Sequence, residues 1–82
     1  MKNLWLFDEK RIAILKKLLQ CDMAQGCDLK ECVRAKKTLL SYHLGLLREG
    51  GIIEEERRGR DKCYRIAPRK RSFVKKVVAL VE

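Results

Sequence analysis

Residues that interrupt regular structure are scarce in this chain, which has one proline, Pro68, and five glycines among 82 residues. We find no internal repeat, low-complexity segment or linker, so the sequence predicts a single domain over residues 1–82. No apolar run is long enough to span a bilayer, and the N-terminal LWLF is too short for a signal-peptide core. We therefore expect a soluble, cytoplasmic protein without a membrane partner.

The residue patterns of enzymes are also missing. The sequence has no glycine-rich phosphate loop, no convergent carboxylate pair in an apolar setting and no nucleophile beside a recognisable base. The single histidine, His43, has no partner at metal-ligand spacing, so we expect it to pack at the edge of the core. The sequence thus predicts a protein that is not an enzyme, with no cofactor and no identified small-molecule ligand.

Acidic residues are outnumbered. Twenty Lys and Arg against eleven Asp and Glu leave a formal charge of +9. The segment from Arg57 to Arg71 holds eight basic residues and one acidic residue, Asp61, so it alone carries +7. This balance favours a polyanionic partner such as nucleic acid or an acidic membrane surface.

The first predicted helix spans about residues 8–21. Asp8 is suited to cap its N-terminus, and Ile12, Leu15 and Leu19 form one apolar line along it. Residues 23–26 are typical of a connection. The chain therefore begins with an amphipathic helix that needs a partner for its apolar face.

The second predicted helix is short, over about residues 28–34. Asp28 is expected to be its N-cap, with Glu31 three residues later completing a pattern like a capping box. The residues that we expect this helix to bury are Leu29, Cys32 and Val33.

The third predicted helix, residues 37–49, has two contrasting faces. Leu40, Leu44 and Leu47 form the face that packs on the first two helices. The opposite face carries short polar groups and one aromatic hydroxyl, from Thr38, Tyr42, Gly45 and Glu49, with Lys37 and Ser41 beside them. Such a surface suits close approach to base edges, although it is also typical of an ordinary solvent-facing helix. Gly45 costs about 1 kcal/mol of helix propensity relative to Ala, which close approach to DNA would explain.

A β-hairpin with a basic tip is predicted over residues 52–66, directly after a Gly-Gly pair that can end the third helix. Gly59 supplies its turn, and the neighbouring cations can contact phosphate or enter a minor groove. A solvated charge run is the alternative. With a last helix over residues 71–82 after Pro68, the predicted fold is mainly α with a small β-hairpin (α+β), a winged helix-turn-helix with a short extra strand.

The stretch from Thr38 to Ile66 resembles the helix-and-wing segment of the ArsR-type (arsenic-repressor-like) winged-helix transcriptional regulators. That family's S-x-H-L, L-x-x-x-G-L-[IV], R-x-G-R and Y-x-[LI] patterns are similar to Ser41-Tyr42-His43-Leu44, Leu47-Arg48-Glu49-Gly50-Gly51-Ile52-Ile53, Arg57-Arg58-Gly59-Arg60 and Tyr64-Arg65-Ile66. The resemblance implies a homodimer whose third helices enter successive major grooves of a pseudo-palindromic operator, and which represses by excluding polymerase.

The resemblance also assigns roles to residues. Lys37, Thr38, Ser41 and Tyr42 take the base and phosphate contacts of the recognition helix, and Arg58 and Arg60 take those of the wing. The complete DNA-binding set that we expect is Lys36, Lys37, Thr38, Ser41, Tyr42, Gly45, Arg48, Arg57, Arg58, Arg60 and Lys62. The partner is then double-stranded DNA and the location cytoplasmic and nucleoid-associated.

Sensor positions of the family are not matched. The metal-sensing members carry a Cys-x-Cys type motif near the DNA-binding helices or paired His and Asp ligands on the last helix, and this sequence has neither. Cys21, Cys27 and Cys32 could still lie near each other, but their spacing fits no standard zinc pattern. Three readings stay open: a metal or thiol-reactive site at these cysteines, a disulfide between Cys21 and Cys27, and reduced cysteines. Cys63 is expected to be a strand residue with no chemistry.

Apolar residues at both ends of the chain predict the dimer contact. A one-domain core would not need all of them, and pairing across a two-fold axis would bury them. The expected interface residues are Leu4, Trp5, Phe7, Phe73, Val74, Val77, Val78 and Val81. In the alternative arrangement the last helix packs only on its own first helix.

The sequence as a whole predicts a dimeric, sequence-specific DNA-binding transcriptional regulator, most simply a repressor. Two other functions remain compatible with it. One is a winged-helix module that docks on a protein or within a larger assembly, and the other is an architectural DNA binder without sequence preference.

Overall fold

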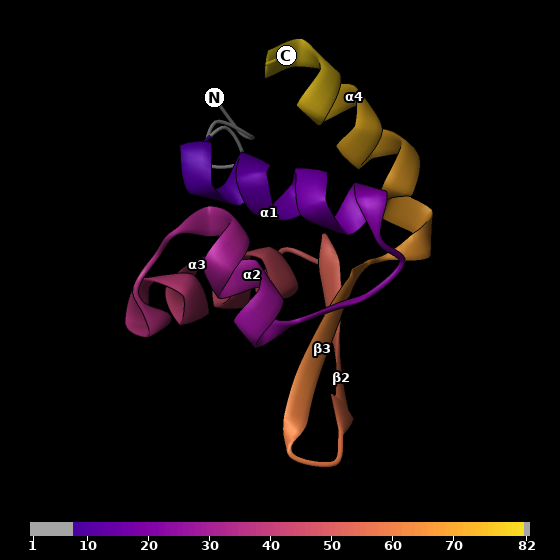
Figure 1. Ribbon diagram of the computed structural model, residues 1–82. Helices are drawn as coiled ribbons and strands as arrows, with labels where there is room; N and C mark the ends of the chain where they lie inside the picture. Colours follow the sequence, from indigo (N-terminus) through magenta and orange to yellow (C-terminus); the bar gives the residue numbers. More distant parts are fainter. Residues whose placement is uncertain (1–7, 82) are drawn as a thin grey trace.

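The computed structural model describes residues 8–81, which form four α-helices and a three-stranded antiparallel sheet (Figure 1). In chain order the elements are α1 (Glu9–Gln20), β1 (Ala24–Gln25), α2 (Gly26–Val33), α3 (Lys37–Glu49), β2 (Ile53–Arg58), β3 (Asp61–Ile66), a 3-10 turn η2 (Pro68–Lys70) and α4 (Arg71–Val81). This architecture confirms the predicted α+β fold, including the short extra strand, which is β1. No helix within these residues is long and apolar enough to cross a membrane.

Helix α1 is the central element, with α4 on one side of it and the α2–α3 pair on the other (Figure 1). Asp8 caps it as predicted, because its carboxylate accepts from the backbone N–H groups of Lys10 and Arg11 at 2.9 and 3.4 Å. Its buried side chains include Ile14 and Leu18, which are completely inaccessible to solvent. Of the apolar line predicted for this helix, Ile12 and Leu15 are buried in the core and Leu19 is partly buried against it.

Helix α2 begins earlier than predicted. It starts at Gly26, its N-cap is Gln25, and Asp28 lies inside its first turn, so the capping role assigned to Asp28 is wrong. The cause lies elsewhere in the chain: Ala24 and Gln25 pair with Tyr64 and Cys63 of β3, and the helix begins directly after this pairing. The predicted burial of Cys32 is also wrong, because its side chain is exposed.

Helix α3 has the predicted bounds and buries Leu40, Leu44 and Leu47. It ends at the glycine pair: Gly51 adopts a φ of 74°, and its N–H donates to the carbonyl of Arg48. A left-handed residue of this kind reverses the chain at a helix end, and glycine adopts it without strain. The next residues enter β2.

Strands β2 and β3 form the predicted hairpin, in which Ile53 lies opposite Ile66 and Arg58 lies opposite Asp61. Gly59, with a φ of 64°, begins the two-residue loop between them. The isoleucine end is buried in the core, whereas the other end extends away from the helices (Figure 1). The hairpin is therefore anchored at its base and presents its basic half to solvent.

Helix α4 packs on its own chain. Val74, Val77 and Val78 are buried in the core cluster of the chain itself, which is the alternative left open from the sequence. They have almost no surface left to offer a second chain. Phe73 is half-buried, and Val81 is 46% exposed. The other three expected interface residues, Leu4, Trp5 and Phe7, lie outside the described residues.

Candidate nucleic-acid interface

The outward side of α3 is accessible along its first two turns. The exposed side chains here, all expected from the sequence, are those of Lys36, Lys37, Thr38, Ser41 and Tyr42. Gly45 continues this surface, and a Cβ added to it would meet nothing within 4 Å. Nothing in the described part of the chain thus requires glycine at position 45.

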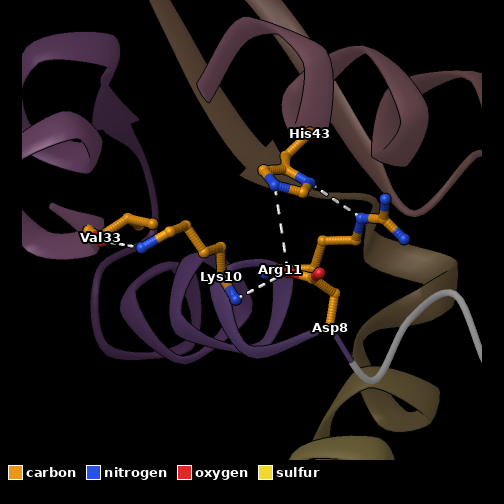
Figure 2. Close-up of polar contacts among 5 residues, drawn as sticks. All are labelled: Asp8, Lys10, Arg11, Val33 and His43. Carbon is orange, nitrogen blue, oxygen red and sulfur yellow. Dashed lines mark hydrogen bonds and ion pairs between the residues drawn. The ribbon is translucent and has the colours of Figure 1, made fainter. Parts of the chain in front are cut away.

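A buried polar network holds the opposite side of α3 (Figure 2). Nε of Arg11 on α1 donates a hydrogen bond to Nδ1 of His43 at 3.0 Å, and both side chains are buried. Nε2 of His43 lies 3.9 Å from a carboxylate oxygen of Asp8. The ring of Tyr42 packs edge-on against the His43 ring, with 5.5 Å between centroids. His43 therefore lies at the edge of the core, as expected, and connects α1 to an exposed aromatic residue of α3.

The network fixes the protonation of its members. Burial lowers the pKa of His43, and the positive charges of Arg11 and Lys10 lower it further, while Asp8 opposes the change. His43 is therefore neutral at pH 7 and its Nδ1 is free to accept from Arg11. Burial alone would raise the pKa of Asp8, but hydrogen bonds from the backbone of Lys10 and Arg11 and the nearby charges lower it overall.

Lys10, next to Arg11 in sequence, reaches the other helix of the pair. Its Nζ donates to the carbonyl of Val33 at 3.3 Å (Figure 2). Val33 is the last residue of α2, where carbonyl groups lack partners within the helix and a cation is favourable. Two adjacent side chains of α1 thus contact the C-terminal end of α2 and the middle of α3.

The hairpin of β2 and β3, which forms the wing, has two chemically different faces. The strand register places Glu54 opposite Arg65 on one face, where their side chains pair at 2.9 Å. On the same face, Glu56 pairs with Arg58 at 2.6 Å, which lowers the pKa of Glu56 and raises that of Arg58. Alternate residues of a strand point to opposite sides, so Glu54, Glu56, Arg58 and Arg65 share one face of the hairpin, which we call the outer face. Its two ion pairs largely neutralise its charge.

The inner face of the wing keeps its cations. Arg57 and Lys62 lie opposite each other on it, and among residues 8–81 neither has a carboxylate partner. The one acid on this face, Glu55, pairs with Arg48 of α3 at 3.0 Å. Burial of Tyr64, together with the charge of Glu55 and a hydrogen bond to it, raises the pKa of the Tyr64 hydroxyl. The sequence could not distinguish Arg58 from Lys62, because this difference depends on the strand register.

A groove of about 520 Å³ separates α3 from the wing. It is lined by Gln25, Gly26, Cys27, Lys30, Lys37, Leu40, Ser41, Leu44, Arg60, Asp61, Lys62 and Tyr64. Four of these are basic and one is acidic. A smaller pocket of about 210 Å³ shares Ser41, Leu44, Lys62 and Tyr64 with this groove and is also lined by Gly45, Arg48 and Glu55. Lys30 is the one basic lining residue that was not expected from the sequence, since only the fold brings α2 beside the wing.

The four cysteines carry no disulfide in this structure. The pairing of Cys21 with Cys27 therefore stays a prediction. Cys21 ends α1, whereas Cys27 lies in the first turn of α2 beyond the extended strand β1. Within residues 8–81, no three His, Cys, Asp or Glu side chains are grouped so that they could hold a metal ion.

Comparison of the sequence with known proteins gives two relatives of the same description. The chain is 30% identical over 73 residues to an arsenical resistance operon repressor of Escherichia coli strain K12, covering 89% of this chain and 62% of that protein. It is 37% identical over 59 residues to the repressor of the same description from Bacillus subtilis strain 168, covering 72% and 56%. The chain thus spans about 60% of the length of these relatives. No protein-family model matches it.

Comparison of the structure supports the same relationship. The fold matches the homodimeric winged helix-turn-helix DNA-binding domain of a possible ArsR-family transcriptional regulator from Mycobacterium bovis, with a TM-score of 0.79 and 28% identity. The match covers 93% of this chain and 69% of that one. A crystal structure of a possible transcriptional regulatory protein from the same organism is 30% identical, with a TM-score of 0.73 and coverage of 93% and 77%.

Proposed function

This chain belongs to the ArsR-type winged helix-turn-helix family, and on that premise we propose that it is a sequence-specific double-stranded DNA-binding protein that represses transcription as a homodimer. The observation that carries the proposal is the basic groove between α3 and the inner face of the wing. A protein that places a helix in the major groove and a hairpin on the flanking minor groove must accommodate the phosphate backbone between them.

The charges of the groove match that requirement. Lys30 and Lys37 lie on its helical side, and Arg60 and Lys62 on its wing side. Asp61 is the single acidic lining residue, and Glu55 is already paired with Arg48. The cations that face the groove are therefore available to replace the counterions of a phosphate strand, whereas Arg58 and Arg65 on the outer face are occupied by glutamates.

The outward side of α3 supplies the groups for reading bases. Thr38, Ser41 and Tyr42 carry hydroxyls on an exposed surface, and such groups can hydrogen-bond base edges or phosphates in the major groove. Lys36 and Lys37 lie at the start of the helix, just before these residues, and their charges favour a nearby DNA phosphate. We assign base contacts to the hydroxyl side chains and backbone contacts to the lysines.

Selection from random duplex DNA tests this function. The enriched duplex is then titrated with the purified protein against a scrambled duplex at two salt concentrations. We expect an inverted repeat with half-sites about one helical turn apart, and affinity that falls steeply with salt. Salt-sensitive binding without any enriched sequence would indicate an architectural binder, and failure to bind any duplex would favour a module that docks on a protein.

A further inference from the structure

Two large apolar side chains of α3, those of Leu39 and Tyr42, are exposed, and Tyr42 lies on the surface proposed to face DNA. Leu39 is 40% exposed and Tyr42 is 57% exposed. They are three residues apart, so they are neighbours on the same side of the helix. Large hydrophobic residues exposed among residues 8–81 occur otherwise on α4, at Leu80 and Val81. Leu39 was not among the DNA-binding residues expected from the sequence.

Leu39 lies in the first turn of α3, at its N-terminal end. It is the third residue of α3, next to Thr38, and the N-terminal residues of a recognition helix are those that reach base edges. Lys36 and Lys37 precede it without any carboxylate partner in the described chain, so the surrounding surface favours DNA phosphates. Tyr42 is held in place by its edge-on contact with the His43 ring.

The chemistry of Leu39 limits what it can contact. A leucine offers no hydrogen bond, and pressing it against a base donor or acceptor would leave that polar group without a partner. The apolar feature of the major groove is the C5 methyl group of thymine. We propose that Leu39 contacts a thymine methyl group in each operator half-site and, with the ring of Tyr42 beside it, is a determinant of sequence specificity. This inference rests on the proposed DNA-binding function.

Replacement of thymine by deoxyuridine tests the proposal, because it removes only the methyl group and keeps the base pair. Each thymine of the selected half-site is replaced in turn, and the dissociation constant is measured for the protein and for Leu39→Ala. We expect one position at which deoxyuridine weakens binding of the unmodified protein about fourfold, the effect of losing one buried methyl-sized group. Leu39→Ala should lose affinity for the thymine site and no longer distinguish the two bases there.

The other outcomes separate the two proposals. Specific binding with no sensitivity to deoxyuridine at any position would overturn the role of Leu39 and leave the proposed function intact. Equal sensitivity in the unmodified protein and in Leu39→Ala would also overturn it, because another residue would then contact the methyl group. Leu39→Met keeps an apolar side chain of similar volume and is expected to retain the discrimination. Absence of binding to any duplex would refute the function and this inference together.

Discussion

Arg11 of α1 and His43 of α3 form a buried hydrogen bond of 3.0 Å, in which the guanidinium Nε donates to the imidazole Nδ1. The pair joins two helices that are distant in sequence. One member is a permanent cation and the other must be neutral to accept, so the contact is sensitive both to substitution and to pH. Because His43 also contacts the Tyr42 ring, the pair lies directly behind the surface proposed to read DNA.

Removal of His43 should destabilise the protein more than removal of both partners. In His43→Leu the buried Arg11 loses its acceptor, and we expect the free energy of unfolding to fall by about 1–3 kcal/mol. Arg11→Met combined with His43→Leu should recover part of this loss, because the guanidinium that lost its acceptor at His43 is then replaced by an apolar side chain. Urea denaturation of the two single variants and the double variant measures the coupling energy. Strictly additive effects would show that the hydrogen bond contributes nothing.

The stability should decrease as pH falls below about 6.5, the ordinary pKa of histidine. Burial lowers the pKa of His43 in the folded protein, so the unfolded chain takes up the proton first as pH falls. The stability contributed by neutral His43 is therefore fully present above the unfolded pKa and is lost as pH falls through the folded pKa. His43→Asn keeps an acceptor near the Nδ1 position without titrating. Between about pH 5 and 7.5 its unfolding free energy should be flatter than that of the unmodified protein, and equal slopes would contradict the assignment.

Gly45→Ala should have opposite effects on the protein and on its complex. An added Cβ meets no atom within 4 Å, and alanine favours a helix over glycine, so we expect a gain of about 0.5–1 kcal/mol in stability. If the backbone at Gly45 approaches DNA closely, the same methyl group weakens DNA binding. Gln20→Ala, at the exposed end of α1, is the control for helix propensity without a DNA contact. Unchanged DNA affinity in Gly45→Ala would remove Gly45 from the interface.

The wing arginines and lysines should differ in their effect on salt dependence. Lys62→Ala and Arg57→Ala remove cations of the inner face that have no carboxylate partner among residues 8–81, and each should lower the slope of log affinity against log salt by about one unit. Arg58→Ala, the matched control on the outer face, should lower it less, because Glu56 already holds this guanidinium at 2.6 Å. Glu56→Gln weakens that pair and should raise the slope. A loss in Arg58→Ala equal to that in Lys62→Ala would contradict the assignment of faces.

Local sequence signals predicted α3 and the hairpin correctly. The apolar spacing of Leu40, Leu44 and Leu47 and the glycine pair that follows are properties of neighbouring residues, so both the face and the end of the helix could be inferred from them. The start of α2 could not be inferred in this way. It depends on the pairing of Ala24 with Tyr64, forty residues further along the chain.

The same distinction limits what the sequence could predict about the candidate site. A valine stripe in α4 indicates that one face must be buried, but periodicity does not reveal whether α1 of the same chain or a second chain covers it. The glutamates at residues 54–56 and the arginines that follow them give the net charge of the hairpin. This net charge does not show that Glu56 pairs with Arg58 while Lys62 has no carboxylate partner in the described part of the chain, because the alternation of faces depends on the hairpin register.

The adjacent side chains of Lys10 and Arg11 connect α1 to both helices of the DNA-binding pair, α2 and α3. Lys10 is bonded to the last residue of α2 and Arg11 to the middle of α3, so one turn of α1 clamps both helices of the DNA-binding pair. A shift of α1 would therefore be coupled to α2 through the Lys10–Val33 hydrogen bond and to α3 through the Arg11–His43 hydrogen bond. In an assembly of two such chains, the distance between the two α3 helices would then depend on the angle between the two α1 helices.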